Sequence, residues 1–319
     1  MSDFIGTKLT MNLGERSYDI ILKNGALENL YQFARLDRRV AVVTDSGVPA
    51  QYAQRVADQC REARIITVPQ GEASKSFKIL ESVLQQMLDF NMGRGDLVVA
   101  VGGGVVGDLA GFAASIYMRG IDFINCPTTT LSMIDSSIGG KTAVDLDSGK
   151  NQAGCFYQPA LVLCDPALLE TLPEAEYRAG CAEIIKTAVL FSPELFQQLK
   201  TTPIRAQFEP VIAACVGMKR DVVQNDEFDR GQRALLNLGH TIGHAVEACS
   251  NFTILHGEGV AIGLAAITRA AVEKGICDPA LLPQVLDILK QYGLPTEVPY
   301  PLADIQKAAE ADNKRRGSV

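Results

Sequence analysis

The stretch DLVVAVGGGVVGDLAGFAASIY, residues 96–117, decides the fold of this chain. A continuous apolar run ends in three glycines, and a helical pattern begins directly after them. The run matches G-x-G-x-x-G from Gly102 to Gly107, a pattern that lets a backbone approach a pyrophosphate at a helix N-terminus. The match alone is weak evidence for a ligand site, because a glycine-rich turn that binds no ligand can have the same sequence pattern. The acidic residue expected about twenty positions on is also missing, since Asp122 begins the next strand.

Apolar runs of the same kind lie on both sides of this stretch. Residues 8–13 and 18–22 alternate polar and apolar around a Gly-Glu-Arg turn, which predicts a short antiparallel hairpin. Strands are predicted over residues 39–45, 63–69, 96–104, 122–130 and 160–165, with helical patterns between most of them. Apolar strands that alternate with helices indicate a parallel sheet covered on both faces. We therefore expect an α/β, Rossmann-like N-terminal domain with a parallel sheet.

The strand signals stop after about residue 165. Helical spacing, punctuated by proline and glycine, then predicts helices near residues 174–191, 193–200, 208–224, 233–250, 257–274, 279–292 and 301–314. The second half is thus expected to be an all-α domain. We place the division at residue 168, with domains 1–168 and 169–319.

The three histidines of the chain, His240, His244 and His256, lie close together in sequence. His240 and His244 are four apart, so a helix places both imidazoles on one face. Imidazole is a common zinc ligand, and such a pair with a third ligand makes an open metal site. Two core histidines bonded to backbone would have the same spacing. His256, just past the predicted helix end, favours the metal site.

Two further groups of residues suggest chemistry. Glu183 and Lys186 share a face of an otherwise apolar helix, so we expect the pair to point inward, where a buried carboxylate needs a cation or a metal. Residues 127–142 place threonines, Asp135, two glycines and Lys141 after a strand, at the end where ligands bind in open α/β sheets. A polar surface loop is the alternative. GGKT resembles a P-loop end, but Asp135 stands where its first glycine would be, which excludes that motif.

Composition narrows the class of protein. The 319 residues carry a formal net charge of −7 without a block of like charge, which argues against nucleic-acid binding and a polybasic membrane patch. Eight cysteines form no C-x-x-C pair, as is typical of reduced thiols in a cytosolic protein. The N-terminal MSDFIGTKLTMNL lacks a signal-peptide pattern, and no apolar run is long enough to span a bilayer. We expect a cytoplasmic protein.

Several motifs occur in one order along the chain: the glycine stretch, RGID, PTT, DSSIGGKT, GKN, AEIIK, RALLNLGHTIGH and LHGE. Together they resemble the dehydroquinate synthase family of the sugar phosphate cyclase superfamily, over residues 38–314. The resemblance implies a domain that binds NAD and a helical domain that holds one divalent metal, zinc or cobalt. It also implies that Glu183, His240 and His256 are the metal ligands and that His244 contacts substrate instead. Asp229 stands where the family usually has glutamate.

The resemblance implies further site residues by motif position. The positions that match cofactor contacts are Asp45, Glu72, Lys75, Gly103, Gly104, Asp108, Thr128, Thr129, Lys150 and Thr171. The positions that match substrate contacts are Arg119, Asp135, Lys141, Asn151, Lys186, Lys219, Arg233, Asn237, His244 and Lys314. In the family the arginine matching Arg119 reaches the neighbouring subunit's substrate, so the resemblance also implies a homodimer.

The implied reaction converts 3-deoxy-D-arabino-heptulosonate 7-phosphate to 3-dehydroquinate and phosphate, in the shikimate pathway. It combines transient oxidation by NAD, phosphate elimination, reduction and an intramolecular aldol closure. Lys141, Asn151 and His244 would hold the phosphate, and Arg233 with Lys219 the carboxylate. The alternatives are a related sugar phosphate cyclase, a metal-dependent polyol dehydrogenase and a non-enzymatic NAD-sensing module.

Overall fold

The computed structural model describes residues 6–146 and 149–316, with side chains up to Glu310. The chain divides into two compact units. The first runs to Leu172 and also includes Lys219–Phe228, and the second holds Pro173–Met218 and the chain from Asp229 on. The predicted division at residue 168 stays a prediction. The structure adds that a segment from the helical half of the sequence groups with the first unit.

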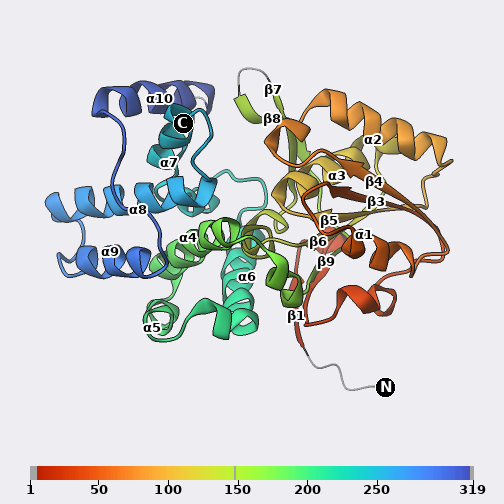
Figure 1. Ribbon diagram of the computed structural model, residues 1–319, viewed down its shortest axis with the longest axis horizontal. Coiled ribbons are helices and arrows are strands. Elements are labelled where there is room, and N and C mark those ends of the chain that lie inside the picture. The colour runs from red at the N-terminus through yellow and green to blue at the C-terminus, as the bar shows by residue number, and fades with distance from the viewer. Residues whose placement is uncertain (1–5, 147–148, 317–319) are drawn as a thin grey trace. The chain divides into compact units, whose positions relative to one another are not determined.

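A seven-stranded sheet forms the centre of the first unit, in the order β1-β2-β9-β6-β5-β3-β4 (Figure 1). The β1–β2 hairpin is antiparallel, and all other neighbouring strands are parallel. The strands are β1 (Thr7–Met11), β2 (Tyr18–Leu22), β3 (Arg39–Asp45), β4 (Glu62–Val68), β5 (Leu97–Gly102), β6 (Asp122–Pro127) and β9 (Leu161–Cys164). The mostly parallel Rossmann-like sheet predicted from the apolar runs is thereby confirmed, including the N-terminal hairpin.

Helices cover both faces of this sheet because the strand side chains are apolar on both sides. Ala41 and Val43 join a core cluster with residues of α2 (Phe77–Asp89) and α3 (Gly104–Ile116). Figure 1 shows these two helices over one face and α1 (Ala50–Ala57) over the other. A fully buried valine or leucine contributes about 1.5–3 kcal/mol to stability, so a core on both faces of the sheet stabilises this unit strongly.

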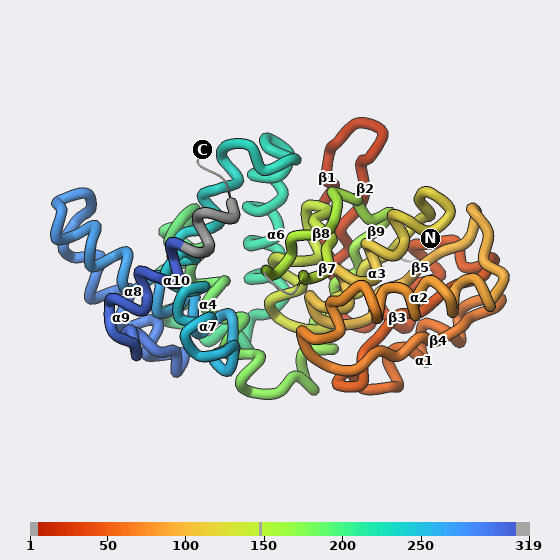
Figure 2. The backbone as a smooth tube through the Cα atoms, turned by 90° about the horizontal axis from the view of Figure 1, so that it is seen from above, coloured from red at the N-terminus to blue at the C-terminus, as the bar shows by residue number. Residues whose placement is uncertain are grey.

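A second, two-stranded sheet lies outside the main one. Strands β7 (Lys141–Leu146) and β8 (Gly149–Phe156) pair antiparallel and lie beside α3 (Figure 2). The sequence predicted no strands here, because polar residues and glycines interrupt the alternation. Lys141, placed after a strand by the sequence analysis, is therefore the first residue of a strand that the sequence did not predict.

The second unit is helical, as predicted. Its helices are α4 (Glu174–Phe191), α5 (Pro193–Thr201), α7 (His240–Cys249), α8 (His256–Glu273), α9 (Leu281–Gln291) and α10 (Leu302–Arg316), and α6 (Phe208–Asn225) begins there. Ala245, Val246, Ile262 and Ile305 form a small core among α7, α8 and α10. Among the described residues, no helix combines the length and apolarity that crossing a bilayer requires.

The predicted single helix over residues 233–250 was wrong. Gln232–Asn237 form a 3-10 helix, and α7 starts only at His240. Gly239 separates the two with φ of +80°, a left-handed conformation that glycine adopts without strain. The break means that Arg233 and Asn237, which the predicted helix would have joined to His240, lie in a separate 3-10 helix.

Candidate functional site

Three side chains from three helices of the second unit converge on one point. Glu183 lies within α4, while His240 and His256 are the first residues of α7 and α8. Each histidine Nε2 lies 3.4 Å from the Glu183 Oε1 atom. Ligand atoms about 2.0–2.1 Å from a tetrahedral zinc ion stand about 3.3–3.4 Å apart, so this spacing fits a shared metal ion.

Glycines allow the three helices to approach this closely. A Cβ on Gly239 would lie 2.7 Å from the backbone nitrogen of Leu264, and one on Gly243 would lie 2.9 Å from the Gly259 carbonyl. Helices α7 and α8 therefore touch backbone to backbone. A Cβ on Gly257 would overlap the Ala179 backbone of α4. No side chain fits at these crossings, and the contact brings the helix starts that carry His240 and His256 next to Glu183.

The environment of Glu183 favours a cation. Its Oε2 atom forms an ion pair with Lys186, whose ammonium also donates to the Leu236 carbonyl at 2.6 Å. Burial alone would raise the pKa of Glu183, but Lys186 and the two imidazoles outweigh it and hold this pKa well below its usual range. The buried Oε1 atom has no hydrogen-bond partner among the described residues. The prediction that Glu183 and Lys186 point inward is confirmed. A buried Oε1 atom without a hydrogen-bond partner is suited to bind a metal ion.

The two imidazoles differ in their protonation. Burial lowers the pKa of His240 to about 4, and its place at a helix N-terminus also disfavours a proton. Burial likewise lowers the pKa of His256, but Glu183 and Glu247 outweigh it and raise this pKa to about 10. The two carboxylates therefore stabilise one positive charge on the imidazole of His256. A divalent ion would supply that charge through neutral imidazoles.

A second acidic residue beside this cluster, Glu247, was not predicted from the sequence. Its Oε1 atom lies 2.9 Å from His256 Nδ1, and the residue is 5% exposed. His244 is half-buried, with ring centroids 5.3 Å from His240 and 5.8 Å from His256. Its ring nitrogen groups with Glu247 and His256, and not with Glu183 and His240. Pairing His240 with His244 as ligands, as spacing alone suggested, is therefore not what the geometry favours.

In the first unit, the glycine stretch lies at a change of direction in the sheet. The chain passes from β3 to β4 on one side and returns to β5 on the other, so a topological switch point lies between β3 and β5. Ligands of open α/β sheets bind at the carboxyl ends of strands at such a point. Gly103 and Gly104 follow β5 there, and Asp45 ends β3. A Cβ on Gly103 would lie 3.2 Å from Thr129, so the loop also closely approaches the chain after β6.

Five of the predicted cofactor and substrate positions form a charged network in this unit. Lys75 donates to Asp108 at 2.7 Å and also bonds the side chain of Asn151. Glu72 lies 3.8 Å from both Lys75 and Lys150. Burial raises the pKa of Asp108 despite the adjacent ammonium of Lys75.

The remaining cofactor positions have local structural partners. Asp45 accepts the backbone N–H groups of Gly47 and Val48, at 2.8 and 3.1 Å. The Thr129 hydroxyl bonds Ser132, and the Thr171 hydroxyl bonds Tyr52, both at 2.8 Å. Thr128 is buried beside the glycine stretch, where its N–H donates to the Gly102 carbonyl.

The predicted substrate residues are dispersed. Lys219 forms an ion pair with Asp135 in the first unit. Lys141 and Arg119 are exposed, and Arg119 has φ of +71°. Arg233 is buried in the 3-10 helix that ends at Asn237. The side chain of Lys314 lies outside the described residues.

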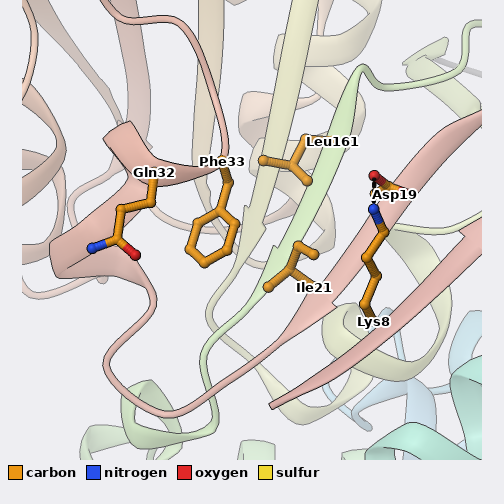
Figure 3. A pocket seen from close by; sticks show the side chains of 6 residues that line it. All are labelled: Lys8, Asp19, Ile21, Gln32, Phe33 and Leu161. Carbon is orange, nitrogen blue, oxygen red and sulfur yellow. Dashed lines mark ion pairs between the residues drawn. The ribbon is translucent and has the colours of Figure 1, made fainter. Parts of the chain in front are cut away.

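A separate hollow of about 310 Å³ opens on the first unit between the hairpin and the 3-10 helix Leu27–Gln32 (Figure 3). Lys8, Asp19 and Phe33 line it, with Lys8 and Asp19 paired at 2.7 Å. None of its lining residues is a predicted site residue.

Comparison with known proteins identifies the family. The family models for the N-terminal and C-terminal parts of 3-dehydroquinate synthase match residues 65–179 and 180–315. The 3-dehydroquinate synthase of Lactiplantibacillus plantarum is 47% identical over 88% of this chain and 81% of its own length. That of Clostridium beijerinckii is 42% identical over 91% of this chain and 86% of its own. The chain belongs to the 3-dehydroquinate synthase family.

Solved structures of sugar phosphate cyclases agree with this family. A 2-deoxy-scyllo-inosose synthase complexed with carbaglucose-6-phosphate, NAD+ and Co2+ has a TM-score of 0.88 at 26% identity, covering 97% of this chain and 89% of its own. A 2-epi-5-epi-valiolone synthase from Streptomyces hygroscopicus with NAD+ and Zn2+ has a TM-score of 0.87 at 30% identity, covering 96% and 88%. A probable glycerol dehydrogenase of Sinorhizobium meliloti, at 18% identity and a TM-score of 0.64, covers 91% and 87% and shares the fold alone.

Proposed function

We propose that this 3-dehydroquinate synthase is a phosphate-eliminating carbon–oxygen lyase that uses NAD and one divalent metal ion, zinc or cobalt. Its substrate is 3-deoxy-D-arabino-heptulosonate 7-phosphate. The observation that carries the proposal is the placement of two imidazole Nε2 atoms 3.4 Å from one orphaned carboxylate oxygen. A degenerate NAD-sensing module has no physical need for such a donor set.

Glu183, His240 and His256 would hold the metal ion, and their donor types suit zinc or cobalt. When bound, the ion supplies Lewis acidity that makes a substrate hydroxyl easier to ionise. Lys186 keeps Glu183 ionised through Oε2, which leaves Oε1 for the ion. His240 stays neutral near pH 7 and keeps a lone pair available.

The glycine stretch at the start of α3 and the network around Lys75 would hold NAD. When bound, NAD would supply reversible hydride transfer, which leaves the reaction with no net redox change. Lys141, Asn151 and His244 are assigned to the substrate phosphate, and Arg233 with Lys219 to the carboxylate, where a guanidinium offers a bidentate contact. Asn237, which lies in the same 3-10 helix as Arg233, is assigned to the substrate as well.

Phosphate release tests this function. The metal-loaded chain with NAD should release one phosphate per 3-dehydroquinate formed, and absorbance at the NADH wavelength should show no net rise. Stoichiometric accumulation of NADH would instead identify a dehydrogenase. Equal turnover of a substrate analogue without the carboxylate would favour a related cyclase of neutral sugar phosphates.

We further propose a homodimer in which Arg119 serves the neighbouring subunit. Arg119 is exposed and has a positive φ, and it is flanked by the exposed apolar side chains of Ile116 and Met118, at 44% and 40%. A left-handed arginine costs conformational energy, which a specific role would explain.

Mixing two inactive variants tests the shared site. Arg119→Ala and His256→Ala chains, coexpressed, should regain about a quarter of parent activity, since half of the dimers carry one intact site. The two variants mixed without subunit exchange should stay inactive, which serves as the control. Absence of recovery in purified heterodimers would contradict the role of Arg119.

A further inference from the structure

We propose that Glu247 is a positioning residue that fixes the orientation and tautomer of His256, so that Nε2 of this histidine faces the metal. The inference rests on the proposed metal centre at Glu183, His240 and His256.

The two nitrogens of His256 face two different carboxylates. Nδ1 lies 2.9 Å from Glu247 Oε1, within hydrogen-bond range, and Nε2 lies 3.4 Å from Glu183 Oε1. A neutral imidazole carries a proton on only one nitrogen. An ionised carboxylate can only accept, so its contact with Nδ1 places the proton there and leaves the Nε2 lone pair for an ion.

The backbone holds Glu247 in place for this task. Its carbonyl accepts the Phe252 N–H at 2.8 Å and the Ser250 hydroxyl at 2.7 Å, in the turn that ends α7. Asn251 and Phe252 adopt φ of +51° and +60° in that turn. The carboxylate is therefore carried on a helix end whose geometry is locked by its own carbonyl.

Gly259 leaves the space that the carboxylate occupies. A Cβ on Gly259 would lie 3.2 Å from both Cγ and Oε1 of Glu247. Gly259 also forms the backbone crossing with Gly243, one turn before Glu247 on α7. The crossing of α7 and α8 thus positions the metal ligand and its hydrogen-bond acceptor together.

Glu247 could alternatively be a ligand itself, since its carboxylate groups with His244 and His256 within 4.8 Å. The 2.9 Å separation from Nδ1 is a hydrogen-bond distance, shorter than the roughly 3.3 Å between two ligands of one tetrahedral ion. The geometry therefore favours a supporting role for Glu247.

Zinc affinity, measured by competition with a chromophoric chelator on the full chain, tests the inference. Glu247→Ala should weaken zinc binding about 10- to 100-fold. Glu247→Gln retains an acceptor oxygen and should lose distinctly less. Glu258→Gln is the matched control: its carboxylate also lies at the start of α8, but it accepts the Leu255 N–H and not His256. It should bind zinc within about twofold of the parent.

The tautomer of His256 can be read without any variant, by nitrogen NMR of the zinc-loaded parent chain. The inference expects a proton on Nδ1 and none on Nε2. Unchanged zinc affinity in a folded Glu247→Ala chain would overturn the positioning role of Glu247. A parent chain that binds two zinc ions, one of which is lost in Glu247→Ala, would also overturn it, because Glu247 would then be a ligand. If the parent binds zinc and the Glu247→Ala variant binds it equally well, the proposed metal centre stands and only the role of Glu247 is contradicted. If the parent does not bind zinc, both the metal centre and the role of Glu247 are contradicted.

Discussion

The two units prepare their polar residues for ligands in opposite ways. In the first, the charges already satisfy one another: Lys75 pairs with Asp108, and Lys219 with Asp135. In the second, Glu183 gives one oxygen to Lys186 and turns the other toward two imidazole nitrogens at 3.4 Å. The charges of the first arrangement are paired with one another, whereas the second turns one carboxylate oxygen and two imidazole nitrogens toward a common point.

This difference has an energetic consequence. An ion can enter the cluster of the second unit without displacing Lys186 from Glu183, and it would take the place of the proton that the carboxylates stabilise on His256. An anionic group that reaches Lys75 must compete with Asp108 for the same ammonium. Part of its binding energy is therefore offset by the lost internal pair. We expect tight metal binding and weaker, charge-sensitive cofactor binding.

The largest expected effect comes from removing a histidine from the second unit. His256→Ala should lower kcat about a thousandfold or more, because loss of the Lewis acid removes several kcal/mol of transition-state stabilisation. Zinc content after gel filtration should fall below one ion per chain. Chelated parent protein should regain activity on adding zinc, and the variant should not. Full activity of exhaustively chelated parent protein would refute a metal-dependent second unit.

A smaller loss is expected from disturbing the helix crossing without touching a ligand. A Cβ at Gly263 would lie 2.8 Å from the Gly239 carbonyl carbon, and neither backbone can rotate away. Gly263→Ala should therefore cost about 1–3 kcal/mol of unfolding free energy or more, and zinc affinity should fall with it. Urea denaturation and chelator competition measure the two effects.

Gly217→Ala provides the matched control in the same unit. It lies within α6, with no atom within 4 Å of the added Cβ. Alanine in a helix interior should stabilise the chain by about 0.5–1 kcal/mol. Equal behaviour of the two alanine variants would mean that the crossing does not set the metal geometry.

The sequence predicted those features that depend on local pattern. The apolar runs of β3 and β5 and the stripe of each helix are local properties, and they gave the sheet and the helical half. The hairpin β7–β8 was missed because its packing beside α3, rather than an apolar run, holds it. The break at Gly239 was missed because residues 235–246 keep a helical period across it.

The metal cluster depends on tertiary contacts that no spacing reveals. Glu183 and His256 are 73 positions apart, and spacing alone paired His240 with His244. Family motifs supplied the grouping, and the glycine crossings explain it physically. Glu247 carried a weak signal, a lone acid seven residues after His240 on the same helical face. The packing of Gly259 against it could not be predicted.

The smallest expected effect tests the charge pairing in the first unit. Lys75 is 4% exposed and Asp108 is 18% exposed. Lys75→Met keeps the apolar stem and removes the charge, which leaves a poorly solvated carboxylate without its cation. We expect a loss of about 1–3 kcal/mol of unfolding free energy at pH 7, measured by urea denaturation. Lys8→Met, at the exposed pair with Asp19, should cost less than about 1 kcal/mol.

The pH dependence of this loss separates charge from packing. Burial raises the pKa of Asp108, and without Lys75 it should rise further. A group whose folded pKa exceeds its unfolded value contributes stability below the unfolded pKa and loses it as pH rises. The penalty of Lys75→Met should therefore shrink as the pH falls toward the ordinary carboxyl range, where Asp108 is protonated and needs no cation. A loss that stays constant between pH 7 and pH 4 would mean that Lys75 acts through packing, and the contrast between the two units would then disappear.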